Sequence, residues 1–265
     1  MNTIAAPRLS DLLTGIATVT PMEDMPIAGI SADSRRIEPG WLFLAAPGTR
    51  ADGRAFIAGA LARGAAAIVY EHGELPLQVS VPAIPVHGLS ARIGEIADRY
   101  FGSPSQRLFI VGVTGTNGKT TCTHLLAQVL DNPTGRCGLI GTLGAGYPEA
   151  LDPATHTTPD AISVHGLLSR FARSGAASVC MEVSSHALDQ GRVQGVAFDV
   201  AVFTNLTRDH LDYHGSMQHY AAAKTRLFEF AGLRAAVINR DDELGRVLIE
   251  KAAQRTKVVS FTVSS

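Results

Sequence analysis

The residues of this chain that are best suited to bind phosphate lie in the segment 112–121, Gly-Val-Thr-Gly-Thr-Asn-Gly-Lys-Thr-Thr. The apolar run 108–113 is typical of a buried parallel strand, and residues 122–130 repeat apolar side chains at helical spacing. The segment should therefore link a strand to a helix N-terminus, where backbone N–H groups and the helix dipole face an anion. Lys119 would add a positive charge, and the Thr120 hydroxyl would suit Mg²⁺.

The match to the general motif G-x-x-x-x-G-K-[ST] is incomplete. Val113 stands at the first glycine position, and Gly115 lies inside the loop instead. Two interpretations are open at this point: a subclass of phosphate-binding loop, or a glycine-rich turn without a ligand. The run Gly118-Lys119-Thr120 at the start of a predicted helix favours the first.

Glu182 and His210 are the candidate partners of this loop. Glu182 follows the apolar run 178–181, which places its carboxylate at the carboxyl end of a predicted strand beside the loop. It could bind Mg²⁺, which takes oxygen ligands, or cap a neighbouring helix. The segment 204–214 is dense in side chains that meet phosphate or metal ions, and we single out His210 within it.

Two later residues are ambiguous on their own. Lys224 lies among alanines in the predicted helix 220–230, where a single lysine is more often a solvated surface residue. Asn239 ends the predicted strand 235–239 and either contacts a nucleotide base or makes an Asx turn. The sequence alone does not decide between the two interpretations of Asn239.

The predicted elements alternate between strands and helices. The breaker cluster 101–105 separates two predicted domains, 1–104 and 105–265. In the first domain we expect strands at 27–32, 41–46 and 67–70 and helices at 54–63 and 93–100. In the second domain we expect strands at 137–140, 178–183, 198–203, 235–239 and 258–263 and helices at 161–174 and 220–230. We also expect a loop there that contains Gly141, Gly144 and Gly146. This order predicts an α/β protein: a small N-terminal α/β domain and a mostly parallel, doubly wound second domain, whose sheet the sequence leaves incomplete.

Composition argues against several classes of protein. The 265 residues are 46% hydrophobic and 18% charged, as expected for one or two soluble globular domains. A net charge of −1 without a basic run argues against a nucleic-acid partner. Cys122, Cys137 and Cys180 have no metal-ligand spacing and cannot all pair, so a reducing cytoplasm is expected. No export signal and no apolar run of roughly 20 residues is visible, so membrane insertion is not expected.

Taken together, these segments resemble the Mur ligases of peptidoglycan assembly, over the whole chain. The loop 112–121 resembles the Mur type of phosphate-binding loop. The segments 182–188, Glu-Val-Ser-Ser-His-Ala-Leu, and 204–215, Thr-Asn-Leu-Thr-Arg-Asp-His-Leu-Asp-Tyr-His-Gly, are similar to two motifs of the members that add the third amino acid of the stem peptide. Asp33-Ser34-Arg35 and Ala51-Asp52-Gly53 are similar to the family's uridine-nucleotide domain.

The resemblance implies a role for individual residues. ATP would be bound by Gly115, Thr116, Asn117, Gly118, Lys119, Thr120 and Thr121, with Asn239 at the adenine. Metal ions would lie near Thr120, Glu182, His210 and Lys224, the last after carbamylation, and Lys119, Glu182, His210 and Lys224 would be catalytic. The uridine diphosphate would contact Ala32, Ser34, Thr49, Arg50 and Ala51, and the muramoyl-peptide would contact His156, Thr157, Thr158, Ser184, Gln190 and Arg192. His156 stands where some members carry asparagine.

The implied activity is ATP-dependent amide ligation with ATP and Mg²⁺ as cofactors. The D-Glu carboxylate of UDP-N-acetylmuramoyl-L-alanyl-D-glutamate would take the γ-phosphoryl group, and the amine of the incoming amino acid would attack the resulting acyl phosphate. We expect meso-diaminopimelate rather than L-lysine as that amino acid, and a monomer. The family's C-terminal domain has no counterpart in these residues, so the chain alone is expected to bind the sugar nucleotide without completing ligation.

Other classes of protein remain open. Folylpolyglutamate synthetase and MurF have related loops, but the first lacks a uridine-type N-terminal domain and the second differs around residues 182–186. A phosphate-loop ATPase and a nucleotide-sugar-binding module are the alternatives outside the ligases. ATP hydrolysis that does not require the sugar nucleotide would favour the ATPase, and tight binding of the sugar nucleotide without affinity for ATP would favour the binding module.

Overall fold

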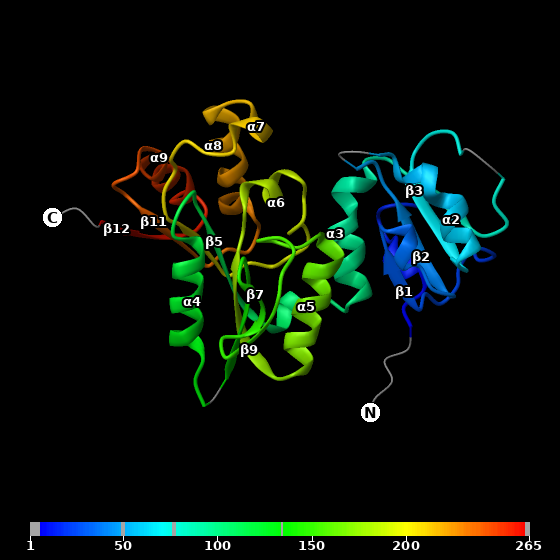
Figure 1. Cartoon of the computed structure of the whole chain (residues 1–265), viewed down its shortest axis with the longest axis horizontal. Coiled ribbons are helices and arrows are strands. Elements are labelled where there is room, and N and C mark those ends of the chain that lie inside the picture. The colour runs from blue at the N-terminus through cyan, green and yellow to red at the C-terminus, as the bar shows by residue number, and fades with distance from the viewer. Residues whose placement is uncertain (1–5, 49–50, 76–77, 134, 263–265) are drawn as a thin grey trace. The chain divides into compact units, whose positions relative to one another are not determined.

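The computed structural model describes residues 6–48, 51–75, 78–133 and 135–262. The polypeptide forms two compact units, Met1–Gly102 and Ser103–Ser265, each with its own sheet. Figure 1 labels the helices and strands of both. Both units are α/β structures with parallel strands, so the predicted fold class is confirmed.

The first unit is built on a four-stranded parallel sheet in the order β1-β2-β3-β4. Its elements are α1 (Leu9–Leu12), β1 (Gly29–Ser31), η1 (Ser34–Arg36), β2 (Trp41–Ala45), η2 (Gly53–Phe56), α2 (Ile57–Ala62), β3 (Ala67–Glu71), β4 (Ala83–Val86) and α3 (Leu89–Tyr100). The strands are mostly apolar, as expected when both faces of a parallel sheet are covered. On one face Phe43, Ile57 and Ile68 are fully buried in a common core.

Two aspartates shape the turns that follow β1 and β2. Asp33 Oδ1 accepts the N–H of Arg35 at 3.0 Å, and Asp52 Oδ1 accepts the N–H of Arg54 at 2.9 Å. Each carboxylate also pairs with the guanidinium of the same arginine. Because β1 and β2 are neighbouring parallel strands, both turns lie at the carboxyl edge of the sheet, where open α/β sheets bind ligands.

The second unit contains an eight-stranded sheet in the order β12-β11-β10-β5-β9-β6-β7-β8. Its strands are β5 (Phe109–Thr114), β6 (Arg136–Gly141), β7 (Gly144–Tyr147), β8 (Ala150–Asp152), β9 (Ala176–Glu182), β10 (Val200–Phe203), β11 (Ala235–Asn239) and β12 (Lys257–Phe261). Its helical segments are η3 (Pro104–Arg107), α4 (Lys119–Leu130), α5 (Ala161–Arg173), α6 (Ser185–Asp189), α7 (Leu211–His214), α8 (Met217–Thr225), η4 (Arg226–Glu229) and α9 (Glu243–Ala252). The six strands from β12 to β6 run parallel, and β7 and β8 are antiparallel. The chain passes from β5 to β6 and β9 on one side and to β10 on the other, so β5 is the topological switch point.

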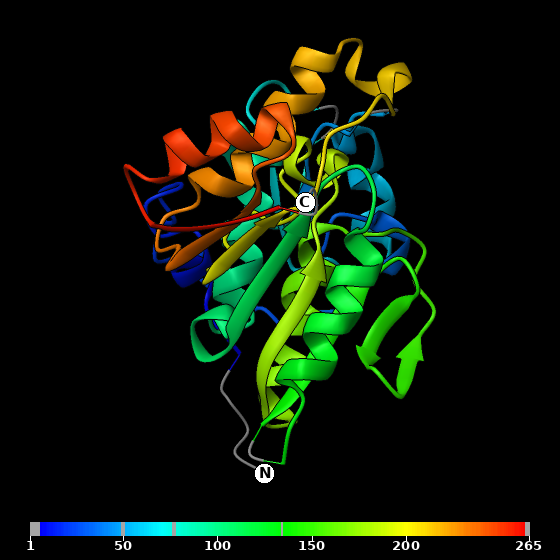
Figure 2. The same cartoon turned by 90° about the vertical axis from the view of Figure 1, so that its left-hand side faces the viewer.

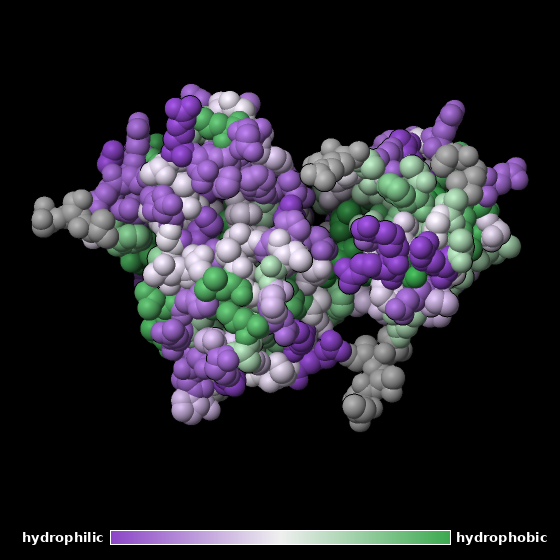
Figure 3. Space-filling view, in the orientation of Figure 1, coloured by the Kyte–Doolittle hydropathy of each residue, from purple (hydrophilic) through white to green (hydrophobic). Residues whose placement is uncertain are grey.

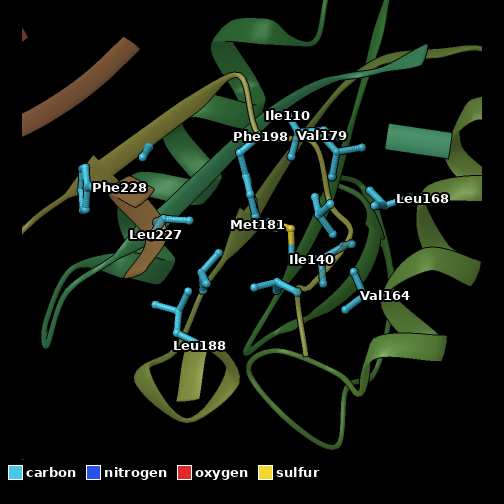
Figure 4. Close-up of a cluster of buried hydrophobic side chains, with 14 of the residues drawn as sticks. Ile110, Ile140, Val164, Leu168, Val179, Met181, Leu188, Phe198, Leu227 and Phe228 are labelled. Atoms are coloured by element: carbon cyan, nitrogen blue, oxygen red, sulfur yellow. The ribbon is translucent and has the colours of Figure 1, made fainter. Parts of the chain in front are cut away.

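Helices cover both faces of this sheet. On one face α4 packs over β5, β6 and β9, and Figure 2 shows α4 in front of the strands with the β7–β8 hairpin at the edge. On the other face α5, η4 and α9 contribute Leu168, Leu227 and Leu248 to the larger core. Figure 4 shows part of that core, where Phe198 lies among the side chains of the central strands. The two cores fix the sheet and therefore the positions of its carboxyl ends.

The hairpin after β6 corrects the predicted loop around Gly141, Gly144 and Gly146. Residues 144–152 form the strand pair β7 and β8. Gly144 and Gly146 have φ values of 145° and 158°, and a Cβ on Gly144 would lie 2.5 Å from the carbonyl oxygen of Asp152. The prediction was wrong because these glycines permit the close approach of two strands rather than only a turn.

Asp242 caps α9 and also ties it to the segment after β10. Its Oδ1 accepts the N–H groups of Leu244 (2.9 Å) and Gly245 (3.3 Å), and its Oδ2 accepts the N–H of Leu206 at 2.7 Å. We expect Asp242→Ala to lower the free energy of unfolding of the second unit by about 2 kcal/mol, because a helix cap and a further acceptor are both lost. Urea denaturation followed by circular dichroism measures the change.

The matched control is Asp160→Ala. Asp160 caps α5 by accepting the N–H of Ser163 at 3.0 Å and also accepts the hydroxyl of that serine, so its bonds stay within one helix. Its loss should lower the free energy of unfolding by about 1 kcal/mol. Equal losses for the two variants would contradict the additional role of the Leu206 bond.

Apolar side chains reach the surface at several places. In the space-filling view they form separate green patches among polar residues (Figure 3). Leu125 and Val129 of α4 are exposed and border an apolar groove of about 430 Å³ that reaches β10, β11 and β12, so α4 leaves part of that sheet face open. Over the described ranges, no helix has the length and apolarity that crossing a bilayer would require.

Candidate functional site

The loop 115–118 connects β5 to α4 at the switch point. The helix begins at Lys119, after Gly118 with a φ of 80°. Gly115 has a φ of 149°, and a Cβ built on it would lie 1.9 Å from the hydroxyl oxygen of Thr204. A side chain at position 115 is therefore excluded by space as well as by conformation, which accounts for the glycine inside the loop.

The segment after β10 holds this loop in shape. Thr116 donates its N–H to the carbonyl oxygen of Asn205 at 2.8 Å, and Asn117 donates its N–H to the Asn205 side-chain oxygen at 3.0 Å. The Thr204 hydroxyl donates to the Asn117 carbonyl oxygen at 2.7 Å. The Thr116 hydroxyl in turn accepts the N–H of Thr207 at 3.0 Å. These bonds fix the backbone conformation of the loop.

Two lysines meet at one carbonyl oxygen of the loop. Lys119 Nζ donates to the Gly115 carbonyl at 3.0 Å, and Lys224 Nζ donates to the same oxygen at 2.7 Å. Lys224 is only 1% exposed and lies over the ring of Tyr220, 4.4 Å from its centroid. The residue is therefore not the solvated surface lysine that its residue type alone indicates. Both lysine side chains therefore converge on the loop that precedes the N-terminus of α4, and helix N-termini favour anions.

The buried surroundings weaken the basicity of both lysines. Burial lowers the pKa of Lys119, and the nearby carboxylates of Glu182 and Asp209 partly oppose this. The pKa of Lys224 falls to about 7, chiefly because of burial and further because of the positive charge of Lys119, while Asp209 acts in the opposite direction. A large share of Lys224 is therefore the neutral amine near pH 7.

Glu182 is the buried carboxylate of the site, with 1% of its surface exposed. Its Oε2 accepts the hydroxyl of Thr120 at 2.9 Å, and its Oε1 accepts the N–H of Thr142 at 2.8 Å. The Thr142 hydroxyl lies 3.2 Å from Oε2 and 3.0 Å from the Thr157 hydroxyl. The carboxylate thus joins the ends of β6 and β9 to the first turn of α4, and the alternative of a simple helix cap does not describe it.

The donor set fits Mg²⁺ better than a transition metal. Thr120 and Glu182 offer hard oxygen atoms in direct contact, and such atoms suit a cation that also retains water and nucleotide oxygens. Within the described residues no group of three or more histidines, cysteines, aspartates or glutamates is arranged to hold a metal ion.

His210 sits at a strained backbone position. Its φ is 50°, a left-handed value that among the described non-glycine residues only Ser103 shares. Its Nε2 lies 3.5 Å from the Asp209 carboxylate, and its ring meets the rings of His186 and Tyr220 edge-on, with centroids 4.9 and 6.0 Å away. Strain of this kind persists where the surroundings demand a particular side-chain direction.

The ring of His186 lies beside those of His210 and His214, with centroids 4.9 and 5.4 Å away. Burial lowers its pKa, and the charges of His210 and His214 lower it further. His214 Nε2 is 2.9 Å from the hydroxyl of Ser185, and burial also lowers its pKa. These surroundings therefore favour the neutral form of both rings.

The predicted peptide-binding residues of the second unit lie around the end of β9. Thr158 is fully buried; its hydroxyl donates to the Glu182 carbonyl at 2.8 Å and accepts the N–H of Ser184 at 3.1 Å. Arg192 donates from Nη1 to the Thr158 carbonyl and from Nε and Nη2 to Gln190 Oε1, at 2.9, 2.9 and 2.6 Å. These residues form one hydrogen-bonded group. His156 lies apart from these bonds, 3.1 Å from the hydroxyl of Thr155.

Asn239 makes the Asx turn that its sequence allowed. Its side-chain oxygen accepts the N–H of Asp241 at 3.0 Å, and its side-chain nitrogen donates to the Thr204 carbonyl at 2.9 Å. The residue thereby braces the segment that shapes the phosphate-binding loop. A contact with adenine stays a prediction.

The predicted uridine-site residues of the first unit follow its first two strands. Ala32 is exposed directly after β1, Ser34 begins η1, and Ala51 precedes the Asp52 turn. Thr49 and Arg50 lie outside the described residues. The described members share the carboxyl edge of one parallel sheet.

Sequence reasoning overlooked three contributors to the site. Thr142 holds Glu182, Asn205 shapes the loop, and the Tyr220 hydroxyl lies 3.1 Å from the hydroxyl of Thr116. Thr142 could have been found because it directly follows β6, the parallel neighbour of β9. Tyr220 lies on helix α8, so no position at a strand end marks it in the sequence.

Two models of protein families match this sequence. The model described as "Mur ligase middle domain" covers residues 113–265, and the one described as "Mur ligase family, catalytic domain" covers residues 26–101. The two matches fall largely within the second and first units, respectively.

Several relatives share the name UDP-N-acetylmuramoyl-L-alanyl-D-glutamate--2,6-diaminopimelate ligase. The relative from Pseudomonas aeruginosa is 52% identical over 244 residues, 91% of this chain and 50% of the relative. The one from Pseudomonas syringae pv. tomato is 56% identical over 241 residues, 90% and 49% of the two chains. The chain thus spans about half the length of these relatives.

Solved structures agree with this likeness. A structure of a ligase with the same name aligns with a TM-score of 0.85 at 35% identity, over 98% of this chain and 53% of the other. MurF from Acinetobacter baumannii aligns with a TM-score of 0.68 at 20% identity, over 97% and 54% of the two chains, which shows a common fold.

Proposed function

The chain belongs to the Mur ligase family, and on that basis we propose that it forms the sugar-nucleotide-binding and ATP-binding part of a MurE-type ligase. Such an enzyme joins an amino acid to UDP-N-acetylmuramoyl-L-alanyl-D-glutamate at the expense of ATP. The names of the most similar relatives support meso-diaminopimelate as that amino acid. The first unit would bind the uridine diphosphate, and the second would bind ATP.

The observation that carries the proposal is the convergence of four groups around one loop. Lys119 and Lys224 share the Gly115 carbonyl, and Thr120 bonds the buried Glu182. Lys119 and the N-terminus of α4 would therefore place positive charge beside hard oxygen ligands, at the end of the central strand β5. This is the arrangement that phosphoryl transfer requires, because the protein contributes mainly position and charge.

The reaction would proceed in two steps. The substrate's D-Glu carboxylate attacks the γ-phosphorus of ATP, which gives an acyl phosphate and ADP. The neutral amine of the incoming amino acid then attacks the acyl carbon, and the tetrahedral intermediate expels phosphate to form the amide. Lys119 would stabilise the charge that develops on the transferring phosphoryl group, and binding the reactants together would supply much of the remaining acceleration.

Thr120 and Glu182 would hold Mg²⁺ together with nucleotide oxygens, with His210 nearby. When bound, Mg²⁺ neutralises charge on the phosphates. The lowered pKa of Lys224 supports carbamylation, because only the neutral amine adds to CO₂. The product is a carbamate and a released proton, and it would replace a cation with an anionic oxygen ligand.

The remaining assignments complete the proposal. Ala32, Ser34, Thr49, Arg50 and Ala51 would contact the uridine diphosphate, and His156, Thr157, Thr158, Ser184, Gln190 and Arg192 the muramoyl-peptide. Asn239 would contact the adenine, with Gly115, Thr116, Asn117, Gly118 and Thr121 at the phosphates. We place the protein in the cytoplasm, because its proposed substrates are nucleotides and its three cysteines are free thiols. We further propose that it is a monomer.

Calorimetric titration with UDP-N-acetylmuramoyl-L-alanyl-D-glutamate tests the proposal. We expect saturable binding to this chain, weakened about fivefold by Ser34→Ala, because a hydrogen bond to a ligand contributes about 1 kcal/mol. Lys119→Ala should leave this affinity nearly unchanged and should weaken binding of ATP instead. The two variants therefore separate the two binding sites.

Three outcomes would contradict the proposal. A folded chain that binds no sugar nucleotide would remove the uridine-site assignment. Hydrolysis of ATP that does not depend on the sugar nucleotide would favour a phosphate-loop ATPase. Tight binding of the sugar nucleotide without affinity for ATP would favour a binding module.

A further inference from the structure

Tyr213 lies on α7 and connects two groups that the proposed function uses. Its hydroxyl donates to Asp189 Oδ2 at 2.9 Å and accepts a hydrogen bond from Gln190 Nε2 at 3.0 Å. Its ring packs against that of His186, with centroids 4.2 Å apart. The tyrosine follows His210 by three residues, so one short helical turn carries both side chains.

The hydrogen bonds through Tyr213 have one possible direction. A guanidinium has donors only, so Arg192 requires the oxygen of the Gln190 amide to face it. The amide nitrogen of Gln190 must then face Tyr213 and donate to its oxygen. The proton of the Tyr213 hydroxyl is left for Asp189, which as a carboxylate only accepts. The chain of hydrogen bonds thus runs from the Arg192 guanidinium, through Gln190 and Tyr213, to the Asp189 carboxylate.

Both ends of this chain are anchored. Asp189 Oδ1 pairs with Arg226 of η4 at 3.1 Å. Arg192 bonds the carbonyl of Thr158 at 2.9 Å, and the Thr158 hydroxyl bonds the carbonyl of Glu182. Linked hydrogen bonds that end on charges of opposite sign reinforce one another. The orientation of the Arg192 guanidinium therefore depends on the Tyr213 hydroxyl, which accepts a hydrogen bond from the amide nitrogen of Gln190.

From this geometry, and resting on the proposed function, we propose that Tyr213 is a positioning residue for the carboxylate-bearing peptide of the sugar-nucleotide substrate. It would act through Gln190, by fixing the amide so that Arg192 is presented in one orientation. A guanidinium fixed in advance binds carboxylate with less loss of side-chain freedom. Tyr213 would not touch the uridine end of the substrate.

Tyr213→Phe tests the proposal because it removes the hydroxyl and retains the ring over His186. Affinities are measured by calorimetry for UDP-N-acetylmuramoyl-L-alanyl-D-glutamate and for UDP-N-acetylmuramate, which lacks the peptide. We expect the variant to bind the first ligand about tenfold more weakly and the second as tightly as the parent chain does. A loss of general stability would weaken both.

Tyr147→Phe is the matched control. The Tyr147 hydroxyl lies 2.7 Å from that of Ser174, and its loss also removes one phenol hydrogen bond from the second unit. We expect this variant to bind both ligands as the parent does. Urea denaturation of both variants shows whether the Tyr213 substitution leaves the unit folded.

A double-mutant cycle with Gln190→Ala identifies the route of the effect. If Tyr213 acts through Gln190, Tyr213→Phe should have no further effect on peptide-ligand affinity once Gln190 is alanine. Additive losses would overturn the proposal, as would equal losses for the two ligands or an unchanged affinity of Tyr213→Phe for the peptide ligand. If the parent chain binds neither ligand, the proposed function fails together with this inference; if the parent binds and Tyr213→Phe is unaffected, only the inference fails.

Discussion

Glutamine in place of Glu182 is expected to leave the second unit folded and to weaken binding of ATP with Mg²⁺ by about 100-fold. The amide keeps an oxygen for the N–H of Thr142, and its NH₂ group can donate to the hydroxyls of Thr120 and Thr142. The free energy of unfolding should therefore change by only about 1 kcal/mol. The negative charge that would face Mg²⁺ is lost, and calorimetric titration with ATP in the presence of Mg²⁺ measures the consequence.

Three comparisons make this prediction specific. In a chelating buffer without Mg²⁺, Glu182→Gln should bind ATP about as well as the parent chain, because the lysines remain. Glu182→Ala should cost about 3 kcal/mol of unfolding free energy, because buried donors lose their acceptor. The exposed Glu250→Gln removes a carboxylate of α9 and should change neither quantity. Unchanged affinity of Glu182→Gln with Mg²⁺ present would contradict a metal-binding role for Glu182.

The sequence was sufficient to predict the parts of the site whose position follows from chain direction. A polar residue directly after an apolar strand must lie at the carboxyl edge of a parallel sheet, so the prediction that Glu182 lies beside the loop 115–118 followed from order alone. The hydrogen bond between Glu182 and Thr120 agrees with that prediction. The same logic, applied to β6, would have identified Thr142.

Other parts of the site depend on packing between distant segments and leave no local pattern. Lys224 looks like a surface residue because its helix is rich in alanine, yet α8 packs against α6 and buries the lysine against the loop. The contact between Tyr213 and Gln190 likewise joins two short helices through side chains alone. The hairpin β7–β8 was missed because glycine usually marks turns, and only the neighbouring strand reveals its other use.

Helix α9 (Glu243–Ala252) shows the opposite case, because its signal was present and unused. Leu244, Leu248 and Ala252 recur at the spacing of one helical face, and Asp242 is a typical capping residue directly before them. The structure buries Leu248 and Ala252 in the larger core. The sequence therefore contained enough information for this helix, in contrast to Tyr213.

Replacing Lys224 with methionine is expected to change how the stability of the second unit depends on pH. The pKa of Lys224 is lowered from 10.5 to about 7 in the folded chain. Between these two values the unfolded chain binds a proton that the folded chain does not, so this lysine makes the free energy of unfolding rise with pH. Below about pH 7 both states are protonated and the full destabilisation, of the order of 5 kcal/mol, is present.

Methionine has similar length and no charge, so the variant should lack this rise. Its free energy of unfolding relative to the parent chain should be most favourable below about pH 7 and should decline steadily towards about pH 10. The variant also loses the hydrogen bond from Lys224 to the Gly115 carbonyl. This loss is the same at every pH, so it lowers the free energy of unfolding without changing how that free energy depends on pH. Urea denaturation at about pH 6, about pH 8 and about pH 10 in buffer free of bicarbonate measures the difference. The exposed Lys251→Met of α9 supplies the control for a lost lysine charge, and parallel curves for parent and Lys224→Met would show that Lys224 keeps its proton throughout this range.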